Sequence, residues 1–235
     1  MSHSWDVLGR LPTAVPPALA EQAAGWPSGA VPASPRRSSS VVLLRDAAAG
    51  VQTYLLHRHA RMSFAASMVV FPGGGMDPAD TSAADPLRAC AVRETEEETG
   101  VRLAPEALLP WAHWVTPEVE PRRFDTAFYL AALPRGAVAA DVSGETDRAE
   151  WRSPASALAA ADRDELGLMP PTRSVLLELA AAATVAELLG AARDRVVRPV
   201  LPQLVRGPAG WRFRYPSPLA ARLDAEAGRR AKDRT

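Results

Sequence analysis

The sequence contains a single cysteine, Cys90, among its 235 residues. One cysteine cannot form a disulfide within the chain, and this composition is typical of a reducing compartment, so we expect a cytoplasmic protein. The chain does not start with a basic segment followed by an apolar run, and it has no stretch of about 18 apolar residues. We therefore expect no signal peptide, no membrane-spanning helix and no membrane partner.

The sequence also lacks an excess of charge of either sign. Its 27 basic and 27 acidic residues give a formal net charge of zero, so no nucleic-acid partner is expected. The dinucleotide fingerprint GxGxxG, the phosphate-loop pattern with its lysine and the GxSxG nucleophile elbow are all absent. Their absence argues against a Rossmann domain, a P-loop enzyme and an α/β-hydrolase.

The first 37 residues are rich in Pro, Ala and Ser and show no alternation of apolar residues. We predict an irregular N-terminal arm over residues 1–37, with a short helix near 17–24, and a main domain with a C-terminal helical extension over 38–235. Trp5 and Trp26 indicate that parts of the arm pack on the body or on the second subunit of a homodimer, whereas a loose tail is the alternative.

Apolar alternation and turn residues predict a mixed series of elements in the main domain. Strands are expected at 39–45, 51–59, 67–71, 111–116, 124–133, 144–151, 196–205 and 211–215, and helices at 86–99, 153–161, 170–182 and from 184 onward. The strand at 51–59 has apolar residues on both faces, so we expect it to be central in a sheet.

One predicted helix ends in a cluster of acidic residues. Asp85-Pro86 predicts its start, because Asp caps free amide donors and Pro is favoured at the first helical position, and Gly100 predicts its end. On a helical wheel, the apolar stripe of the first turns continues into three glutamates spaced i, i+3 and i+4. These are Glu94, Glu97 and Glu98.

Three carboxylates on a partly buried face repel one another and lose hydration. A hard divalent cation relieves both costs, because Mg²⁺ takes oxygen ligands and keeps waters that a phosphate can replace. The pattern therefore predicts a metal site, with an exposed acidic helix end as the alternative.

The residues around this helix include candidates for binding a phosphate. Residues 72–75, Pro-Gly-Gly-Gly, are predicted to form a turn. Its consecutive glycines allow backbone amides to approach a pyrophosphate closely, and arginine side chains match phosphate geometry. The candidate substrate-binding residues are Gly73, Gly74, Arg58, Arg61, Arg122 and Arg123. Solvated arginines are the alternative for each of the last four, and His57 and His59 are expected to be surface or cleft residues rather than metal ligands.

The stretch from Gly74 to Val101 resembles the Nudix box, Gx5Ex7REUxEExGU, in which U is a bulky aliphatic residue. Gly74 and Asp80 match its first part, and the segment 93–101 matches its second. The sequence departs from the box in three ways. The first acid is Asp80 rather than Glu, and twelve residues rather than seven separate it from Arg93. Thr95 stands where an aliphatic residue is usual. The additional residues are expected in the loop before the helix, where insertions cost little.

This resemblance implies a Nudix α/β/α sandwich with a mixed β-sheet over roughly residues 39–182. It also implies a hydrolase that cleaves the diphosphate linkage of a nucleoside diphosphate derivative, with Mg²⁺ or Mn²⁺ as cofactor and a small-molecule nucleotide as partner. The implied metal ligands are Glu94, Glu97, Glu98 and Asp80.

The remaining roles also follow from the resemblance. Arg93 would pair with a carboxylate and orient the site. One of the box glutamates, or an outside acid before a tryptophan, would accept the proton from water. Glu145 fits this outside acid best by position, and Glu150 is second.

The passage WVTPEVEPRRFDTAFYLAAL, residues 114–133, is similar to one in a branch of the family that includes a coenzyme A diphosphatase. The branch implies coenzyme A or an acyl-CoA as substrate. Residues 56–61 match the coenzyme A signature only in part, so ADP-ribose, NADH and a nucleotide sugar stay open. A Nudix-like sensor that binds a nucleotide without cleaving it is the alternative of another class, and it would predict loss of box glutamates.

Overall fold

The structure is a computed structural model that describes residues 5–59, 67–144 and 146–217. In this part of the chain nine strands form one mixed sheet, and two more form a separate hairpin. No helix among the described residues is long and apolar enough to cross a membrane.

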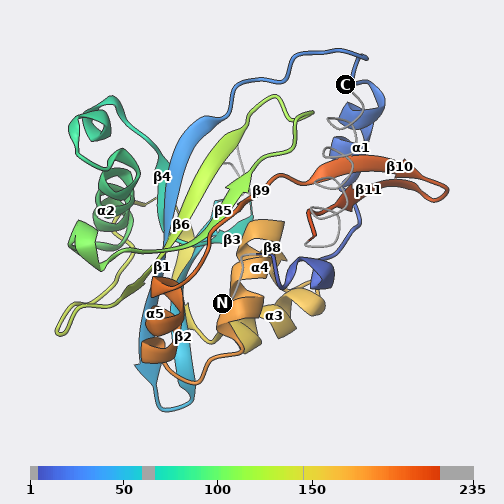
Figure 1. Ribbon diagram of the computed structural model, residues 1–235. Helices are drawn as coiled ribbons and strands as arrows, with labels where there is room; N and C mark the ends of the chain where they lie inside the picture. The colour runs from blue at the N-terminus through green and yellow to red at the C-terminus, as the bar shows by residue number, and fades with distance from the viewer. Residues whose placement is uncertain (1–4, 60–66, 145, 218–235) are drawn as a thin grey trace, which may run out of the picture.

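The centre of the sheet is built from the five longest strands (Figure 1). Strands β1 (Arg36–Ala47) and β2 (Gly50–Arg58) form an antiparallel hairpin. Strand β6 (Phe124–Ala132) runs parallel to β1, and β5 (Leu109–Val115) pairs antiparallel with β6. Strand β2 lies between β1 on one side and β7 (Thr146–Arg152) on the other, which confirms that it is central.

Short strands extend this sheet. Strand β3 (Met68–Val70) pairs with β2 and with β8 (Gly167–Leu168), and β9 (Pro199–Val200) pairs with β5. Strand β4 (Gly73–Gly75) pairs antiparallel with the first half of β1. The prediction of one strand over 196–205 is wrong in extent. The structure has two strands there, β9 and the hairpin strand β10 (Gln203–Gly207), and Pro202 lies between them.

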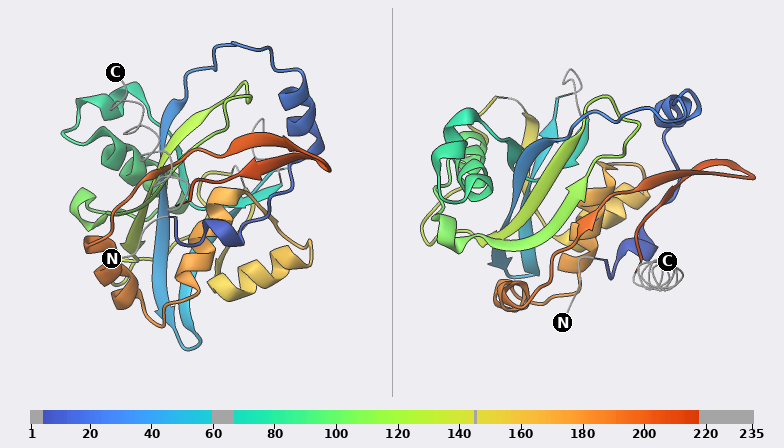
Figure 2. Two further views of the ribbon diagram at one scale, coloured as in Figure 1. Left: turned by 45° about the vertical axis from the view of Figure 1, so that its right-hand side comes forward. Right: turned by 45° about the horizontal axis from the view of Figure 1, so that its top comes forward.

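Helices cover both faces of the sheet (Figures 1 and 2). Helix α2 (Pro86–Thr99) lies on one face, and α3 (Pro154–Asp162), α4 (Pro170–Leu179) and α5 (Val185–Arg193) lie on the other. Successive side chains of β1 enter two cores, Val41 and Leu43 on the α2 side and Val42 and Leu44 on the opposite side. The predicted α/β/α sandwich with a mixed sheet is confirmed.

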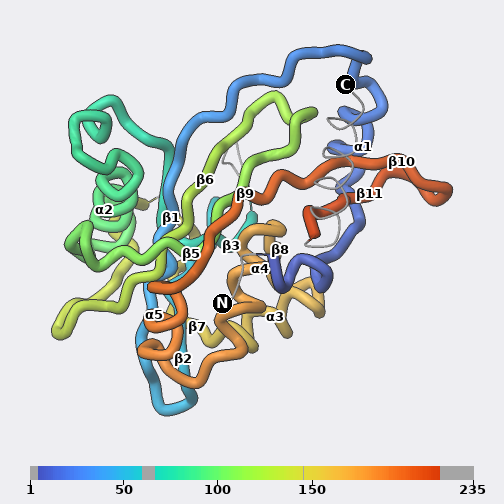
Figure 3. The backbone as a smooth tube through the Cα atoms, in the orientation of Figure 1, coloured from blue at the N-terminus to red at the C-terminus, as the bar shows by residue number. Residues whose placement is uncertain are grey.

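The N-terminal segment packs on the body of its own chain. Leu8, in a 3-10 helix (Leu8–Arg10), is buried in the same core as α4 and α5, and helix α1 (Pro17–Ala24) follows at the predicted position. The amide of Phe213, in β11 (Gly210–Arg214), donates a hydrogen bond of 2.8 Å to the carbonyl of Thr13. The tube in Figure 3 shows this N-terminal segment lying beside the hairpin of β10 and β11.

Candidate active site

Helix α2 begins and ends as its sequence predicts. The side chain of Asp85 accepts a hydrogen bond from the amide of Arg88, and Gly100 takes a left-handed conformation at φ 70°. Val101 is buried beyond this glycine. The two ends are thus fixed by a cap and by a residue without a β-carbon, which sets the position of the glutamates on the last two turns.

The three glycines before the helix form strand β4 rather than the turn that the sequence predicts. They lie against α2, and a β-carbon on Gly74 would stand 2.4 Å from Oε2 of Glu94. Only a glycine allows this approach. The sequence cannot reveal this strand by propensity, because glycine is depleted in strands and the partner strand β1 lies more than thirty residues away.

Arg93 is the centre of the hydrogen-bonding network at the site. Its Nη1 donates to Glu94 and to Glu97, at 2.9 Å each, and its Nη2 donates to Asp80 at 2.9 Å. Nη2 also donates to the carbonyl of Gly75 at 3.1 Å. Arg93 therefore ties the helix both to β4 and to the loop between them, as its predicted orienting role requires.

The loop between β4 and α2 folds as a short 3-10 helix (Pro78–Ser82). Asp80 is buried, its Oδ2 accepts from the amide of Asp77, and its carboxylate accepts from Arg93. The hydrogen bonds from Arg93 lower the pKa of Asp80. These bonds engage both oxygens of Asp80, so the geometry gives this residue a structural role beside Arg93, and its role as a metal ligand stays a prediction.

The three box glutamates differ in environment. Burial raises the pKa of Glu94. Glu98 is 7% exposed, and its Oε2 accepts a hydrogen bond of 2.7 Å from the amide of Gly73. The side chain of Glu97 is 57% exposed, so it has room to turn. The helix end therefore presents one buried, one half-buried and one exposed carboxylate, and Glu98 and Glu94 lie against the glycine strand.

This donor set fits a hard divalent cation. Oxygens of Glu94 and Glu97 already converge on one cationic atom, Nη1 of Arg93, and all three glutamates offer only oxygen donors. Among the described residues, no three acidic, histidine or cysteine side chains stand close enough together to hold a metal ion in their present rotamers. Turning Glu97 away from Arg93 is the change that a cation at this site would require.

Comparison with known proteins identifies this arrangement. A model of the NUDIX domain matches residues 34–170, which is more than half of the chain. The chain belongs to the NUDIX family. The match begins just before β1 and ends at the start of α4, so it contains both β4 and α2.

Two Nudix hydrolases are similar to this chain. A Caenorhabditis elegans protein that carries a nudix hydrolase name (nudix hydrolase 7) is 26% identical over 178 residues, which are 61% of this chain and 60% of that protein. The chain thus spans about 60% of the length of this curated relative. The crystal structure of a NUDIX hydrolase from Alicyclobacillus acidocaldarius superposes with a TM-score of 0.61 and 25% identity, over 67% of this chain and 96% of that one.

Two departures from the Nudix box have a structural explanation. The additional residues lie in the 3-10 helix and the turn that precede Asp85, outside the core elements, as predicted. Thr95 is fully buried, and its hydroxyl donates a 2.7 Å hydrogen bond to the carbonyl of Ala91. The hydroxyl is thereby satisfied inside the helix, so threonine fits where an aliphatic residue is usual.

Cys90 is inert in this Nudix site. It is fully buried, and burial raises the pKa of its thiol to about 11. A buried thiol with a raised pKa forms little thiolate, so a packing role rather than a nucleophilic one follows.

The arginines predicted to bind substrate lie in different environments. Arg123 is 7% exposed, and it donates to the carbonyls of Thr116 and Ala33 at 3.1 and 2.8 Å. These bonds give its side chain a structural role in closing the loop, and its role as a substrate contact stays a prediction. Arg122 is exposed in the same loop and stays a prediction, whereas Arg61 lies outside the described residues.

Arg58 lies in β2, where it pairs in register with Thr146. Its Nε is buried and has no hydrogen-bond partner in the described structure. Thr146 donates to Asp141, whose loop is bound to the end of α2 by a 3.3 Å hydrogen bond from the amide of Val142 to the carbonyl of Glu98. Arg58 therefore lies beside a segment that is fixed to the acidic end of the helix.

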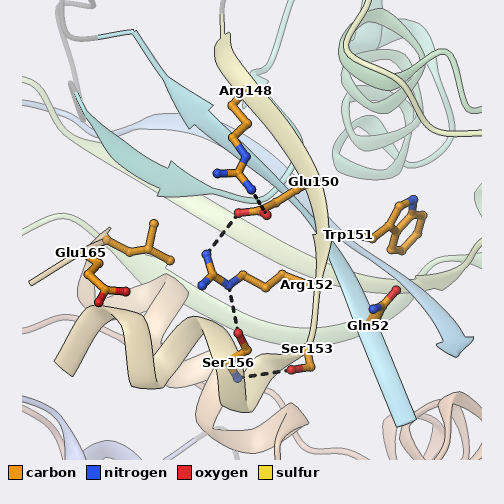
Figure 4. A pocket seen from close by; sticks show the side chains of 9 residues that line it. Gln52, Arg148, Glu150, Trp151, Arg152, Ser153, Ser156 and Glu165 are labelled. Carbon is orange, nitrogen blue, oxygen red and sulfur yellow. Dashed lines mark hydrogen bonds and ion pairs between the residues drawn. The ribbon is translucent and has the colours of Figure 1, made fainter. Parts of the chain in front are cut away.

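The second candidate for the outside acid, Glu150, lies away from this site. It binds His57 and accepts from Arg148 and Arg152 in a polar cleft of about 510 Å³ between β7 and α3 (Figure 4). Trp151, the next residue, points to the α2 side, so Glu150 faces the opposite side of the sheet. Its role as a proton acceptor stays a prediction that this position does not favour, and the first candidate, Glu145, lies outside the described residues.

Proposed function

We propose that this protein is a divalent-cation-dependent Nudix hydrolase that cleaves the diphosphate linkage of a nucleoside diphosphate derivative. The observation that carries the proposal is the end of α2, where Glu94, Glu97 and Glu98 face the glycine strand and Arg93 gathers two of them. Family membership and the hydrolase relatives support it independently.

Glu94, Glu97 and Glu98 would hold Mg²⁺ or Mn²⁺. When bound, the cation would neutralise the charge of the diphosphate and make a water molecule more acidic. Arg93 is already bonded to three carboxylates and a carbonyl, so it acts by orienting these groups. A proton acceptor is needed for the attacking water, and the candidates are a box glutamate or Glu145.

Arg58 is the candidate phosphate ligand with the best support inside the protein. A buried guanidinium nitrogen without a partner is costly, and an anionic substrate would satisfy it with a charge-assisted hydrogen bond. Gly73 and Gly74 shape the floor of the site, because their lack of side chains brings Glu94 and Glu98 against the strand.

The substrate that the sequence supports best is coenzyme A or an acyl-CoA, cleaved to 3′,5′-ADP and a 4′-phosphopantetheine product. The support is the resemblance of residues 114–133 to a coenzyme A branch of the family. ADP-ribose, NADH and nucleotide sugars share the same diphosphate chemistry and are the competing substrates.

A Mg²⁺-dependent hydrolysis screen tests the proposal. Wild type and Glu98→Gln are incubated with coenzyme A, acetyl-CoA, NADH, ADP-ribose and a nucleotide sugar, and the products are identified by mass spectrometry. We expect cleavage of the coenzyme A compounds by wild type and its loss in Glu98→Gln.

Each other outcome is informative. Cleavage of a different compound would keep the site and replace the substrate. Binding of a nucleotide without cleavage would replace the hydrolase by a sensor.

A further inference from the structure

Strand β7 lies at an open edge of the sheet. It pairs antiparallel with β2, and no other described strand pairs with it. In the part of the chain that the structure describes, its seven residues make no further backbone–backbone hydrogen bond. Along an edge strand, alternate residues direct their amide and carbonyl groups away from the sheet. β7 therefore presents a row of unpaired backbone groups to which another strand can bind.

The polar cleft of about 510 Å³ follows this edge (Figure 4). Three consecutive residues of β7, Glu150, Trp151 and Arg152, line it, although successive side chains of a strand point to opposite faces. Gln52 lies on the Trp151 side of the strand, and Ser156 lies on the other side. The cleft therefore runs along the backbone edge and has side chains on both sides, which is the shape that an added strand requires.

The sequence of β7 is complementary to itself in the antiparallel direction. The strand extends from Thr146 to Arg152, so Ala149 is its central residue. When two copies pair about Ala149, all seven residues of each strand are paired, and Arg148 of each copy lies directly opposite Glu150 of the other. Unlike charges in this position stabilise a strand pair, and like charges destabilise it. Centring the pair on Glu150 instead would place Arg148 opposite Arg152 and Glu150 opposite itself, so the charges favour the register that pairs the whole strand.

The side chains of β7 are placed for such a pair. Arg148 lies on the same face as Glu150, and its side chain is 63% exposed. Its Nη2 donates to Glu150 at 2.6 Å, whereas its Nε and Nη1 make no hydrogen bond with the described residues and stay available for a second carboxylate. Ala149 is half-buried and carries only a methyl group, so two copies can approach closely at the axis.

Charged side chains on an edge strand often prevent pairing, because the like charges of two copies repel each other. In β7 the sign alternates along the face opposite α2, from Arg148 to Glu150 to Arg152. Antiparallel pairing of such a row about its centre brings unlike charges together. The formal net charge of the chain is zero, so no overall repulsion opposes the approach of two copies.

We propose that two copies of this chain form a dimer by antiparallel pairing of their β7 edges about Ala149. The two-fold axis is then perpendicular to the sheet, so the two sheets join into one and both α2 helices lie on the same face of it. The contacts between Arg148 and Glu150 fix the register. This interface contains none of the residues proposed to hold the cation, so its test does not depend on the proposed function.

Sedimentation velocity tests the dimer without any substrate. At micromolar concentrations, wild type should sediment with twice the 25.0 kDa mass of one chain. Arg148→Glu and Glu150→Arg each place like charges opposite each other, so each should raise the dissociation constant of the dimer roughly tenfold to a hundredfold. An equimolar mixture of the two variants restores both contacts between unlike charges and should sediment as a heterodimer. Arg135→Glu, which makes the same change at an exposed loop residue, is the matched control and should leave the dimer intact.

A cross-link at the axis tests the register. Ala149→Cys places two cysteines directly opposite each other, with β-carbons about 5 Å apart, so mild oxidation should link the copies. Asp147→Cys is the matched control, because two cysteines there stay roughly 13 Å apart along the strands and should not be linked. The native Cys90 is fully buried and should give no background.

Three outcomes would overturn the proposal. These are a wild type that is monomeric at micromolar concentrations, a dimer that withstands Arg148→Glu as well as it withstands Arg135→Glu, and equal linking of Asp147→Cys and Ala149→Cys. Arg148 is exposed, so the first two comparisons stand even if Glu150→Arg does not fold. A monomer that nevertheless cleaves a diphosphate would refute the dimer and leave the proposed function intact.

Discussion

Replacing Gly74 by alanine perturbs the contact between β4 and the acidic end of α2. The new β-carbon would stand 2.4 Å from Oε2 and 2.5 Å from Cδ of Glu94. Glu94 cannot simply rotate away, because its Oε1 is bound to Arg93 and its side chain is largely buried. The carboxylate must therefore move by roughly 1 Å, and displacements of that size at a catalytic group cost about a hundredfold in rate.

A hundredfold loss of kcat/KM corresponds to about 2.7 kcal/mol of transition-state stabilisation. Gly74→Ala should have a smaller effect on the free energy of unfolding, because the new β-carbon clashes with the end of the Glu94 side chain rather than with backbone atoms. We would measure kcat/KM on the substrate found in the screen, and the free energy of unfolding by urea denaturation.

The adjacent glycine provides the control. A β-carbon on Gly75 meets only Arg36, at 3.7 Å, so Gly75→Ala should keep nearly full activity and stability. If Gly74→Ala were as active as Gly75→Ala, the argument that the glycine strand fixes Glu94 would be refuted. Equal and large losses in both would show instead that β4 tolerates no side chain at all.

Three further predictions concern the support of the site. Leu8→Ala should lower the free energy of unfolding by about 3 kcal/mol, because Leu8 is 2% exposed in the core; a loss under about 1 kcal/mol in urea denaturation would contradict this packing. Asp80→Asn should lower stability by about 2 kcal/mol and reduce kcat, because Arg93 loses a charged partner; unchanged kcat would show that Arg93 is held without it. Burial raises the pKa of Glu178 to about 7 from 4.5, so the folded state binds the proton more tightly and the free energy of unfolding should fall as pH rises through this window. Glu178→Gln should flatten that slope between about pH 5 and 8, and an identical slope in both proteins would exclude Glu178 as its source.

The helix of the site could be predicted to the residue, because its signals are local. Asp85-Pro86 and Gly100 act within one turn of the helix ends, and the spacing of the glutamates follows from the helical period. The sequence could also predict that Arg93 pairs with a carboxylate, because Glu94 and Glu97 are its neighbours on the helix surface.

The features that sequence reasoning missed depend on distant partners. Arg122 and Arg123 are adjacent in one polar loop, and no local signal indicates that Arg123 binds the carbonyl of Ala33, ninety residues earlier. Glu150 matches the expected position of an acid just before a tryptophan, because Trp151 follows it. The pleat of β7 nevertheless places its side chain on the face of the sheet opposite α2. The contact of Gly74 with Glu94 exists only because β1 and β4 pair, and three glycines give no indication of that pairing.

The contact between the N-terminal segment and the terminal hairpin also affects how this chain folds. The hydroxyl of Tyr215 donates to the carbonyl of Pro12, across 203 positions of sequence. On the ribosome, Leu8 and its neighbours are made before α4, α5 and the hairpin, and they cannot be buried until these elements have been made. Closing so long a loop is slow, so these apolar residues stay exposed while the intervening chain is made and form a binding site for a chaperone on the nascent chain.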